Sequence, residues 1–172
     1  MNDFITLAKE RCSVRKFKST PVEQEKLDLI LEAGRVAPTA CNNQPQKIYA
    51  VTSPENREKL ASVTPCTFDA PVIFVIGYDE ERAARGRRYG EKNFGDTDTS
   101  IVTAHMMLEA WEQGIGTCWV GMFRSSDVKK ALSLPENVTI THLLPAGYAA
   151  DGYEPSEMHR TIREKDDTIA YL

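Results

Sequence analysis

The chain has little with which to build a metal centre or a disulfide framework. Its 172 residues include only four cysteines and three histidines. The cysteines (Cys12, Cys41, Cys66 and Cys118) are widely spaced and form no C-x-x-C pair, and the histidines are equally dispersed. Zinc sites usually place paired ligands about two to five residues apart. The sequence therefore predicts no metal site, and we expect free thiols that are mostly buried.

Long apolar runs and an excess of positive charge are also missing. No apolar stretch approaches the roughly 20 residues that a membrane-spanning helix needs. Charges interrupt the N-terminal segment MNDFITLAKER, which therefore lacks the apolar core of a signal peptide. The formal net charge of −4 argues against general binding to nucleic acid or anionic membranes. These absences predict a cytoplasmic protein with neither kind of partner.

Several catalytic motifs are absent as well. There is no G-x-S-x-G nucleophile elbow, no P-loop pattern and no cysteine in a protease-like context. The nearest approach to the G-x-G-x-x-G dinucleotide fingerprint is Gly114-Ile115-Gly116, which follows a helical pattern and has Trp119 in place of the third glycine. With so few dedicated acid–base groups, the chain is of the kind in which a cofactor carries the chemistry.

What is present indicates a single domain over residues 1–172. Hydrophobic residues make up 41% and charged residues 27% of the chain, as in ordinary globular proteins. A chain of this length buries about 70% of the surface that its unfolded form exposes. There are no repeats and no low-complexity linker. The polar tail over about residues 150–172 is either disordered or laid across another surface.

Helical and strand patterns alternate, which argues for a layered α+β or α/β domain. Thr20-Pro21-Val22-Glu23 reads as a capping box that opens a helix with an apolar face ending at Gly34. Further helices are predicted from residue 54, over 97–113, and from Ser125 or Ser126 to before Pro135. The 97–113 segment is apolar almost all round and predicts a buried central helix ended by Gly114. Strands are predicted over 47–52, 71–78, 117–120 and 138–148, the second covered on both faces.

Four segments combine residue types of chemical interest. The stretch from Arg11 to Arg15 holds two arginines four residues apart with Ser13 between them, and guanidinium forks suit phosphate oxygens. The others are Pro38–Pro45, Gly114–Gly121 and the pair Arg160 and Arg163. Each has a plain alternative: a solvated basic turn, a loop of turn formers, a helix cap before a buried strand, and solubilising charges.

In this order and spacing the four segments resemble the nitroreductase family of FMN-dependent oxidoreductases, in its compact bacterial or archaeal form. The resemblance spans roughly residues 11–163. It implies an α+β fold in which helices flank a central mixed or antiparallel sheet. It also implies an intertwined homodimer, with the tail over about residues 150–172 wrapping the partner subunit.

The resemblance further implies an FMN site. Arg11 and Ser13 would bind the phosphate, with Cys12 between them, and Arg163 would reach it from the tail. Arg15 would face the ribityl chain and the N1–C2=O edge, where a cation stabilises the reduced ring. No side chain is expected to be catalytic, because flavin N5 carries the chemistry.

Other groups would enclose the flavin ring. By the same resemblance, Pro38, Thr39, Ala40 and Asn42 of the second subunit would pack on the ring. The stretch Val120-Gly121 would offer a backbone N–H to N5, and glycine there lets the ring approach the main chain closely.

The sequence departs from the family pattern at three places. Gln46 stands where the family commonly has a bulky aromatic residue. The segment 63–69 lacks the Asn or Lys often used near the pyrimidine edge. The terminal motif often reads Lys-x-Arg, whereas here Arg163 is preceded at three residues' distance by Arg160, its substitute partner.

The segment over residues 80–92 is rich in arginine, at positions 82, 85, 87 and 88. It reads either as a solvated helix face or as a patch near the flavin mouth that favours anionic substrates or the NADPH phosphate.

The resemblance implies hydride transfer from NAD(P)H through flavin N5 to a nitroaromatic, quinone or similar small-molecule acceptor by a ping-pong mechanism. Two alternatives stay open. One is a specialised superfamily reaction such as reductive dehalogenation or flavin cleavage, and the other is a non-catalytic flavin-binding protein.

Overall fold

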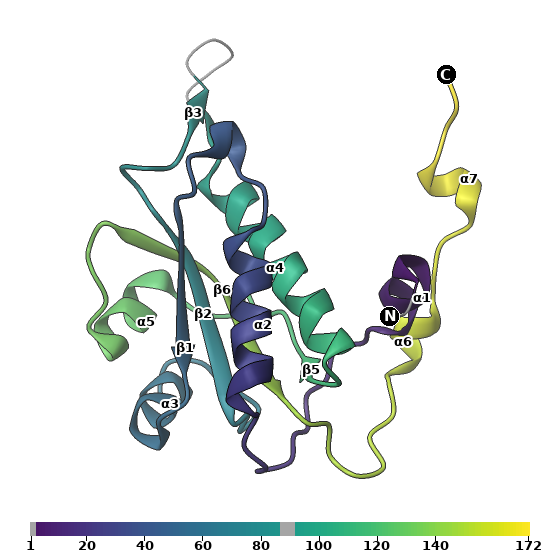
Figure 1. Cartoon of the computed structure of the whole chain (residues 1–172), viewed down its shortest axis with the longest axis horizontal. Helices are drawn as coiled ribbons and strands as arrows, with labels where there is room; N and C mark the ends of the chain where they lie inside the picture. The colour runs from purple at the N-terminus through teal and green to yellow at the C-terminus, as the bar shows by residue number, and fades with distance from the viewer. Residues whose placement is uncertain (1–2, 87–91) are drawn as a thin grey trace.

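A four-stranded antiparallel sheet forms the centre of the computed structural model, which describes residues 3–86 and 92–172. The strand order is β1-β2-β6-β5, formed by β1 (Gln46–Val51), β2 (Val72–Asp79), β6 (Val138–Gly147) and β5 (Gly116–Thr117). Helices α2 (Gln24–Arg35) and α4 (Gly95–Glu112) cover one face, and α3 (Pro54–Ala61) and α5 (Ser125–Leu132) cover the other (Figure 1). The expected α+β fold is confirmed.

Strand β2 is the middle of the core. All eight of its residues are buried, as its continuous apolar sequence predicts. Because side chains alternate along a strand, Phe74 and Ile76 pack with α2 and α4, whereas Ile73 and Val75 pack with α3 and α5. The antiparallel partners β1 and β6 lie on either side of it.

Helix α4 begins two residues before the predicted start. The Asn93 carboxamide oxygen accepts a hydrogen bond from the Gly95 N–H at 2.8 Å, which fixes the first turn. Val102, Met106 and Ala110 face the sheet and are fully buried. The opposite side is only partly covered within one chain, so the expectation of a helix buried all round is wrong for the single chain.

The capping box predicted at Thr20–Glu23 and the serine cap predicted at Ser125 or Ser126 are both wrong. Helix α2 starts at Gln24 with Glu23 as its N-cap, and the Glu23 carboxylate accepts a hydrogen bond from the Tyr148 hydroxyl at 2.6 Å instead of capping the helix. Helix α5 has Arg124 as its N-cap, because the Ser125 hydroxyl accepts the Ile140 N–H at 2.9 Å. In both cases a side chain predicted to take part in the cap forms its hydrogen bond with a residue outside the helix.

Other predicted features are confirmed. Ser53 caps α3 through the Asn56 N–H, and Gly114 follows α4 with a φ of 73°. The predicted strand over 117–120 is shorter than expected: β5 ends at Thr117, and Val120 makes an isolated bridge to Leu143.

Short elements complete the chain. Helix α1 (Phe4–Glu10) precedes Arg11, its C-cap, and a 3-10 turn spans Ala40–Asn42. The strands β3 (Arg85–Gly86) and β4 (Lys92–Asn93) pair as a hairpin. The described part of the arginine-rich segment is therefore turn and strand, and the helix-face interpretation is wrong there. Positions 87 and 88 lie outside the described residues.

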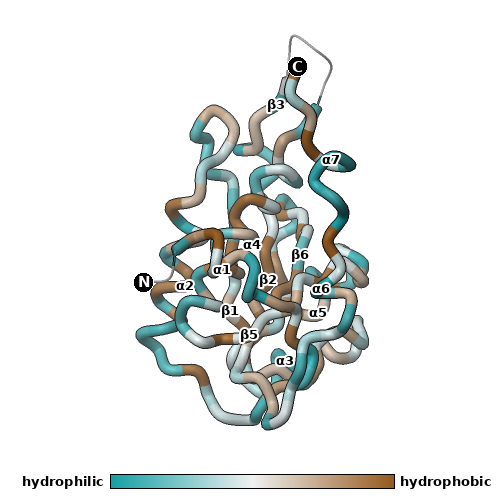
Figure 2. The backbone as a smooth tube through the Cα atoms, turned by 90° about the vertical axis from the view of Figure 1, so that its right-hand side faces the viewer, coloured by the Kyte–Doolittle hydropathy of each residue, from teal (hydrophilic) through white to brown (hydrophobic). Residues whose placement is uncertain are grey.

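The tail carries α6 (Glu157–Arg160) and α7 (Lys165–Thr168) and stands away from the sheet and its helices (Figure 1). It is mostly hydrophilic, with short hydrophobic stretches (Figure 2), and Ile162 is 78% exposed. An exposed tail with hydrophobic side chains could bury them by packing on a surface outside its own chain. Within residues 3–86 and 92–172, no helix combines the length and apolarity needed to cross a membrane.

Candidate functional site

The residues expected to form one site lie at the two ends of α4. At its C-terminal end, the Val14 N–H donates to the Thr117 carbonyl at 2.8 Å, which ties residues 11–15 to β5. At its N-terminal end, the Ala40 N–H donates to Asp98 Oδ1 at 2.8 Å, which ties residues 38–42 to the first turn. An 18-residue helix is about 27 Å long. One chain therefore presents two half-sites.

The C-terminal half-site is an extended segment whose side chains alternate. Cys12 and Val14 are 2% and 1% exposed and point into the protein, so Arg11, Ser13 and Arg15 point outward together. A cavity of about 410 Å³ opens over them, lined by Arg11, Cys12, Ser13, Arg15, Ser156, Met158 and His159. Two cations and a hydroxyl on one face, with no carboxylate among the lining residues, suit an anion.

Cys12 has a structural role in this segment. Burial raises the pKa of its thiol, which favours the neutral form.

Two interactions hold residues 11–15 in place. The Tyr153 hydroxyl, from the start of the tail, donates to the Ser13 carbonyl. Gly116 lets β5 lie directly against the segment, since a Cβ atom there would be only 2.5 Å from Val14 Cγ2. The glycine is thus required by the close approach of the two segments.

The tail contributes three lining residues that the sequence analysis did not assign to the site: Ser156, Met158 and His159. His159, in α6, lines the cavity beside the arginines, and only its closeness in sequence to Arg160 could have suggested it. Arg160 and Arg163 are exposed and are not among the described residues that line the cavity. Their assignment to a phosphate stays a prediction.

The N-terminal half-site is a loop in a constrained conformation. Cys41, Asn42 and Gln44 have φ values of 55°, 53° and 50°, the left-handed region that non-glycine residues rarely adopt. Two hydrogen bonds hold the loop. Within it, the Gln44 N–H donates to Thr39 Oγ1 at 3.0 Å, and Asn43 Nδ2 donates to the Arg82 carbonyl at 3.0 Å. Strain of this kind persists where surrounding contacts over-determine it, typically at ligand sites.

Asp98 anchors this loop and was also missed by the sequence analysis. It is 1% exposed, one oxygen accepts the Ala40 N–H, and the other has no hydrogen-bond partner among the described residues. Its place in the first turn of α4 favours a negative charge there. An acidic residue at a helix start was the only available signal.

Gly121 provides an open stretch of main chain near the first half-site. A Cβ atom added there would meet nothing within 4 Å. The Val120 N–H already donates to the Leu143 carbonyl at 2.9 Å, so of the two predicted donors only Gly121 has its N–H to offer. The segment 63–69 lies alongside, because Thr64 Oγ1 donates to the Met122 carbonyl at 2.8 Å.

Comparisons with known proteins agree with this architecture. The sequence profile of the Nitroreductase family matches residues 8–67 and 64–148. The crystal structure of a nitroreductase family protein from Clostridium difficile 630 superposes with a TM-score of 0.91 at 34% identity, covering 99% of this chain and 98% of that one.

Two sequence relatives have named activities. An FMN reductase (NAD(P)H) of Bacillus subtilis is 28% identical over 168 residues, which cover 88% of this chain and 68% of that protein. An NADPH-dependent oxidoreductase of Staphylococcus epidermidis is 30% identical over 153 residues, which cover 79% of this chain but only 61% of that longer protein.

Proposed function

The chain belongs to the nitroreductase family, and from that premise we propose how its two half-sites work. The protein is an NAD(P)H-dependent FMN oxidoreductase. Its acceptors are nitroaromatics, quinones or similar small molecules, which take their electrons after the nicotinamide has left, in a ping-pong mechanism. The observation that carries the proposal is the outward-facing set of Arg11, Ser13 and Arg15 over a cavity of about 410 Å³.

The residues present fit FMN. Arg11 and Ser13 offer charged and neutral donors for the phosphate, and Arg15, the next outward-facing residue of this extended segment, would face the ribityl chain and the N1–C2=O edge. Arg163, with Arg160 as a substitute, is proposed to complete the phosphate site from the tail. Gly121 has the open main chain that a flat ring needs.

FMN, when bound, supplies the hydride-accepting and electron-donating chemistry at N5. The chain's own task is to bind and orient. The Gly121 N–H would donate to N5, and the guanidinium of Arg15 would stabilise negative charge at the opposite edge. Among the described histidines, His105 is exposed on α4 and bonded to the Ile101 carbonyl. Replacing it should leave NAD(P)H oxidation within about tenfold.

We infer a homodimer from the placement of the two groups of residues. The Arg11 segment is tied to β5 beyond the C-terminal end of α4, whereas residues 38–42 are tied to its first turn. A second copy related by a twofold axis can bring its Pro38, Thr39, Ala40 and Asn42 to the first copy's Arg11 segment, which forms two equivalent sites.

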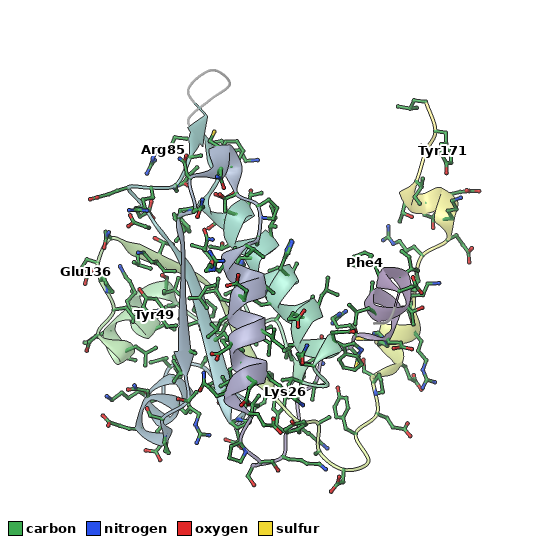
Figure 3. All side chains as sticks on the ribbon, in the orientation of Figure 1. Phe4, Lys26, Tyr49, Arg85, Glu136 and Tyr171 are labelled. Atoms are coloured by element: carbon green, nitrogen blue, oxygen red, sulfur yellow. The ribbon has the colours of Figure 1, made fainter. Side chains whose placement is uncertain are left out.

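The surface of the single chain supports such an assembly. An apolar groove of about 610 Å³ runs between α1, α2 and α4. Phe4, Leu29 and Val36 on its walls are 63%, 47% and 60% exposed. Phe4 and, in the tail, Tyr171 both lie on segments that stand apart from the body (Figure 3). An intertwined dimer would cover these groups and bury more than about 2,000 Å².

We place the protein in the cytoplasm. All four cysteines are free, and Cys12 and Cys118 are buried. Free thiols are typical of a reducing compartment.

The test uses purified protein under anaerobic conditions. Heat-released cofactor should migrate as FMN, and NADH or NADPH should bleach the flavin. Addition of a nitroaromatic or a quinone should restore its colour, and steady NAD(P)H consumption with these acceptors distinguishes an enzyme from a non-catalytic flavin carrier. Release of FAD or of no flavin would overturn the proposal.

A further inference from the structure

Trp119 lies next to the proposed N5 donor and faces α4. Its neighbours Cys118 and Val120 are 3% and 4% exposed and pack on the α3 and α5 side of the sheet. Alternation therefore turns Trp119 to the other side. Its indole is 36% exposed, and it is only two residues from Gly121. A large aromatic surface is thus presented close to the open main chain.

A β-bulge brings His142 to the same side. Ile76 pairs with His142, but the next residue, Gly77, pairs with Ile140, which leaves Thr141 as an extra residue in β6. A bulge re-aims the side chains around it. As a result Thr141 and His142, although consecutive, both contact hydroxyl groups of α4.

His142 and Trp119 are joined in a chain of hydrogen bonds. Trp119 Nε1–H donates to His142 Nδ1 at 3.0 Å, and the rings meet edge to face with centroids 4.8 Å apart. Because indole can only donate, Nδ1 is an acceptor and the proton of the neutral ring is on Nε2. Nε2 lies 3.2 Å from Ser100 Oγ, whose own proton goes to the Asp96 carbonyl at 2.7 Å.

This series of hydrogen bonds requires the His142 imidazole to be neutral. Burial lowers the pKa of His142, and the opposing influence is the Asp96 carboxylate on α4, which acts to raise it. From the other elements, β2 contributes the apolar Ile76 and the 118–121 segment contributes Trp119. At neutral pH the neutral ring prevails, with Nδ1 free to accept the indole N–H. Protonation of Nδ1 would place two donors against each other and break this hydrogen bond.

We propose that Trp119 forms a wall of the acceptor site that selects flat aromatic acceptors, and that His142 is the positioning residue that holds its indole in place. The inference rests on the proposed function, since it takes the flavin ring to lie beside Gly121. An indole held by two contacts offers a rigid apolar face to a planar ring without losing further rotamer freedom on binding. A small inorganic oxidant does not stack on an aromatic ring, so its reduction should not depend on the Trp119 indole.

The experiment compares two acceptors on the FMN-loaded enzyme. 2-Methyl-1,4-naphthoquinone is the flat acceptor and ferricyanide the non-stacking one. The variants are Trp119→Leu, which removes the wall, and His142→Phe, which keeps a ring but removes the acceptor nitrogen. Lys59→Ala, on the exposed surface of α3, is the control.

Both site variants should raise KM for the naphthoquinone about three- to tenfold, the size expected for one aromatic contact. Their kcat and their kinetics with ferricyanide should stay within about twofold, and Lys59→Ala should match the wild type. In the wild type, KM for the quinone should rise as the pH falls and His142 becomes protonated. In His142→Phe it should be high and independent of pH.

Three results would overturn the inference. The first is an unchanged quinone KM in Trp119→Leu, and the second is an equal loss with ferricyanide. The third is a change of oligomeric state in Trp119→Leu by light scattering, which would assign the indole to a subunit interface. A wild type that lacks FMN, or that reduces neither acceptor, would instead refute the proposed function.

Discussion

Replacing Gly116 by alanine should test how closely β5 must approach residues 11–15, the proposed phosphate-binding segment. The new Cβ atom would lie 2.5 Å from Val14 Cγ2 and 2.8 Å from Val14 Cβ. Carbon atoms in contact are normally about 3.5–4.0 Å apart, so the overlap is about 1 Å. Val14 cannot rotate away, because its Cβ is itself involved, its side chain is β-branched and it is 1% exposed.

The two segments must therefore separate. Doing so stretches the 2.8 Å bond from the Val14 N–H to the Thr117 carbonyl and moves Arg11, Ser13 and Arg15 relative to the rest of the site. Overpacking of a well-filled core usually costs about 1–3 kcal/mol. With a urea m-value of about 2 kcal/mol per M, the unfolding midpoint should fall by about 0.5–1.5 M.

The assay is urea unfolding of the flavin-free protein, followed by a titration with FMN. Flavin-free protein is used because a ligand that binds only the folded state adds its own stabilisation. For the unfolding measurement alone, Gly121→Ala is the control, since its Cβ would meet nothing within 4 Å and stability should change by less than about 0.5 kcal/mol. An unaltered midpoint and FMN affinity in Gly116→Ala would show that the contact is not restrictive and refute the reasoning.

Three other changes address the charge, the buried imidazole and the tail. Arg11→Ala should weaken FMN by about 1.5–3 kcal/mol, or roughly 10- to 150-fold in Kd by fluorescence titration, whereas Lys59→Ala, which removes an exposed helix pair, should not. Because the pKa of His142 is lowered from 6.5 by burial, the unfolded chain binds more protons below that pH. The free energy of unfolding should therefore fall as the pH drops below 6.5 and through the folded pKa, and His142→Phe should lack this component in urea titrations above and below 6.5. Removing residues 162–172 should convert dimer to monomer by light scattering and lower the flavin content. A truncated protein that stays dimeric with its full flavin content would contradict the proposed exchange of tails.

Much of the local structure could be predicted because it depends on neighbours in sequence. The eight-residue apolar run of β2, the Ser53-Pro54 start of α3 and the glycine after α4 are confirmed. Each follows from side-chain periodicity or from the backbone preference of one residue. The motif from Arg11 to Arg15 could likewise be identified, because guanidinium groups and hydroxyls at alternate positions face one way on an extended chain.

The predictions of helix caps failed where a residue outside the helix forms a hydrogen bond with the side chain that was expected to cap it. The Glu23 side chain makes no capping bond at the start of α2 because Tyr148, 125 residues away, donates to its carboxylate, and Ser125 does not cap α5 because it accepts from Ile140. Such choices depend on packing between elements, which a local pattern does not contain.

The sequence by itself determined the layered α+β character, the family and the chemical type of the groups proposed to bind the flavin. Only the tertiary structure decided where those groups lie: the length of α4 separates Arg11 from Pro38, and the Asp98 carboxylate holds the strained loop at the far end. The bulge at Thr141, which joins His142 to Trp119, is likewise a product of sheet register. Register and helix placement are set by the packing of the whole core, so no single segment could have revealed them.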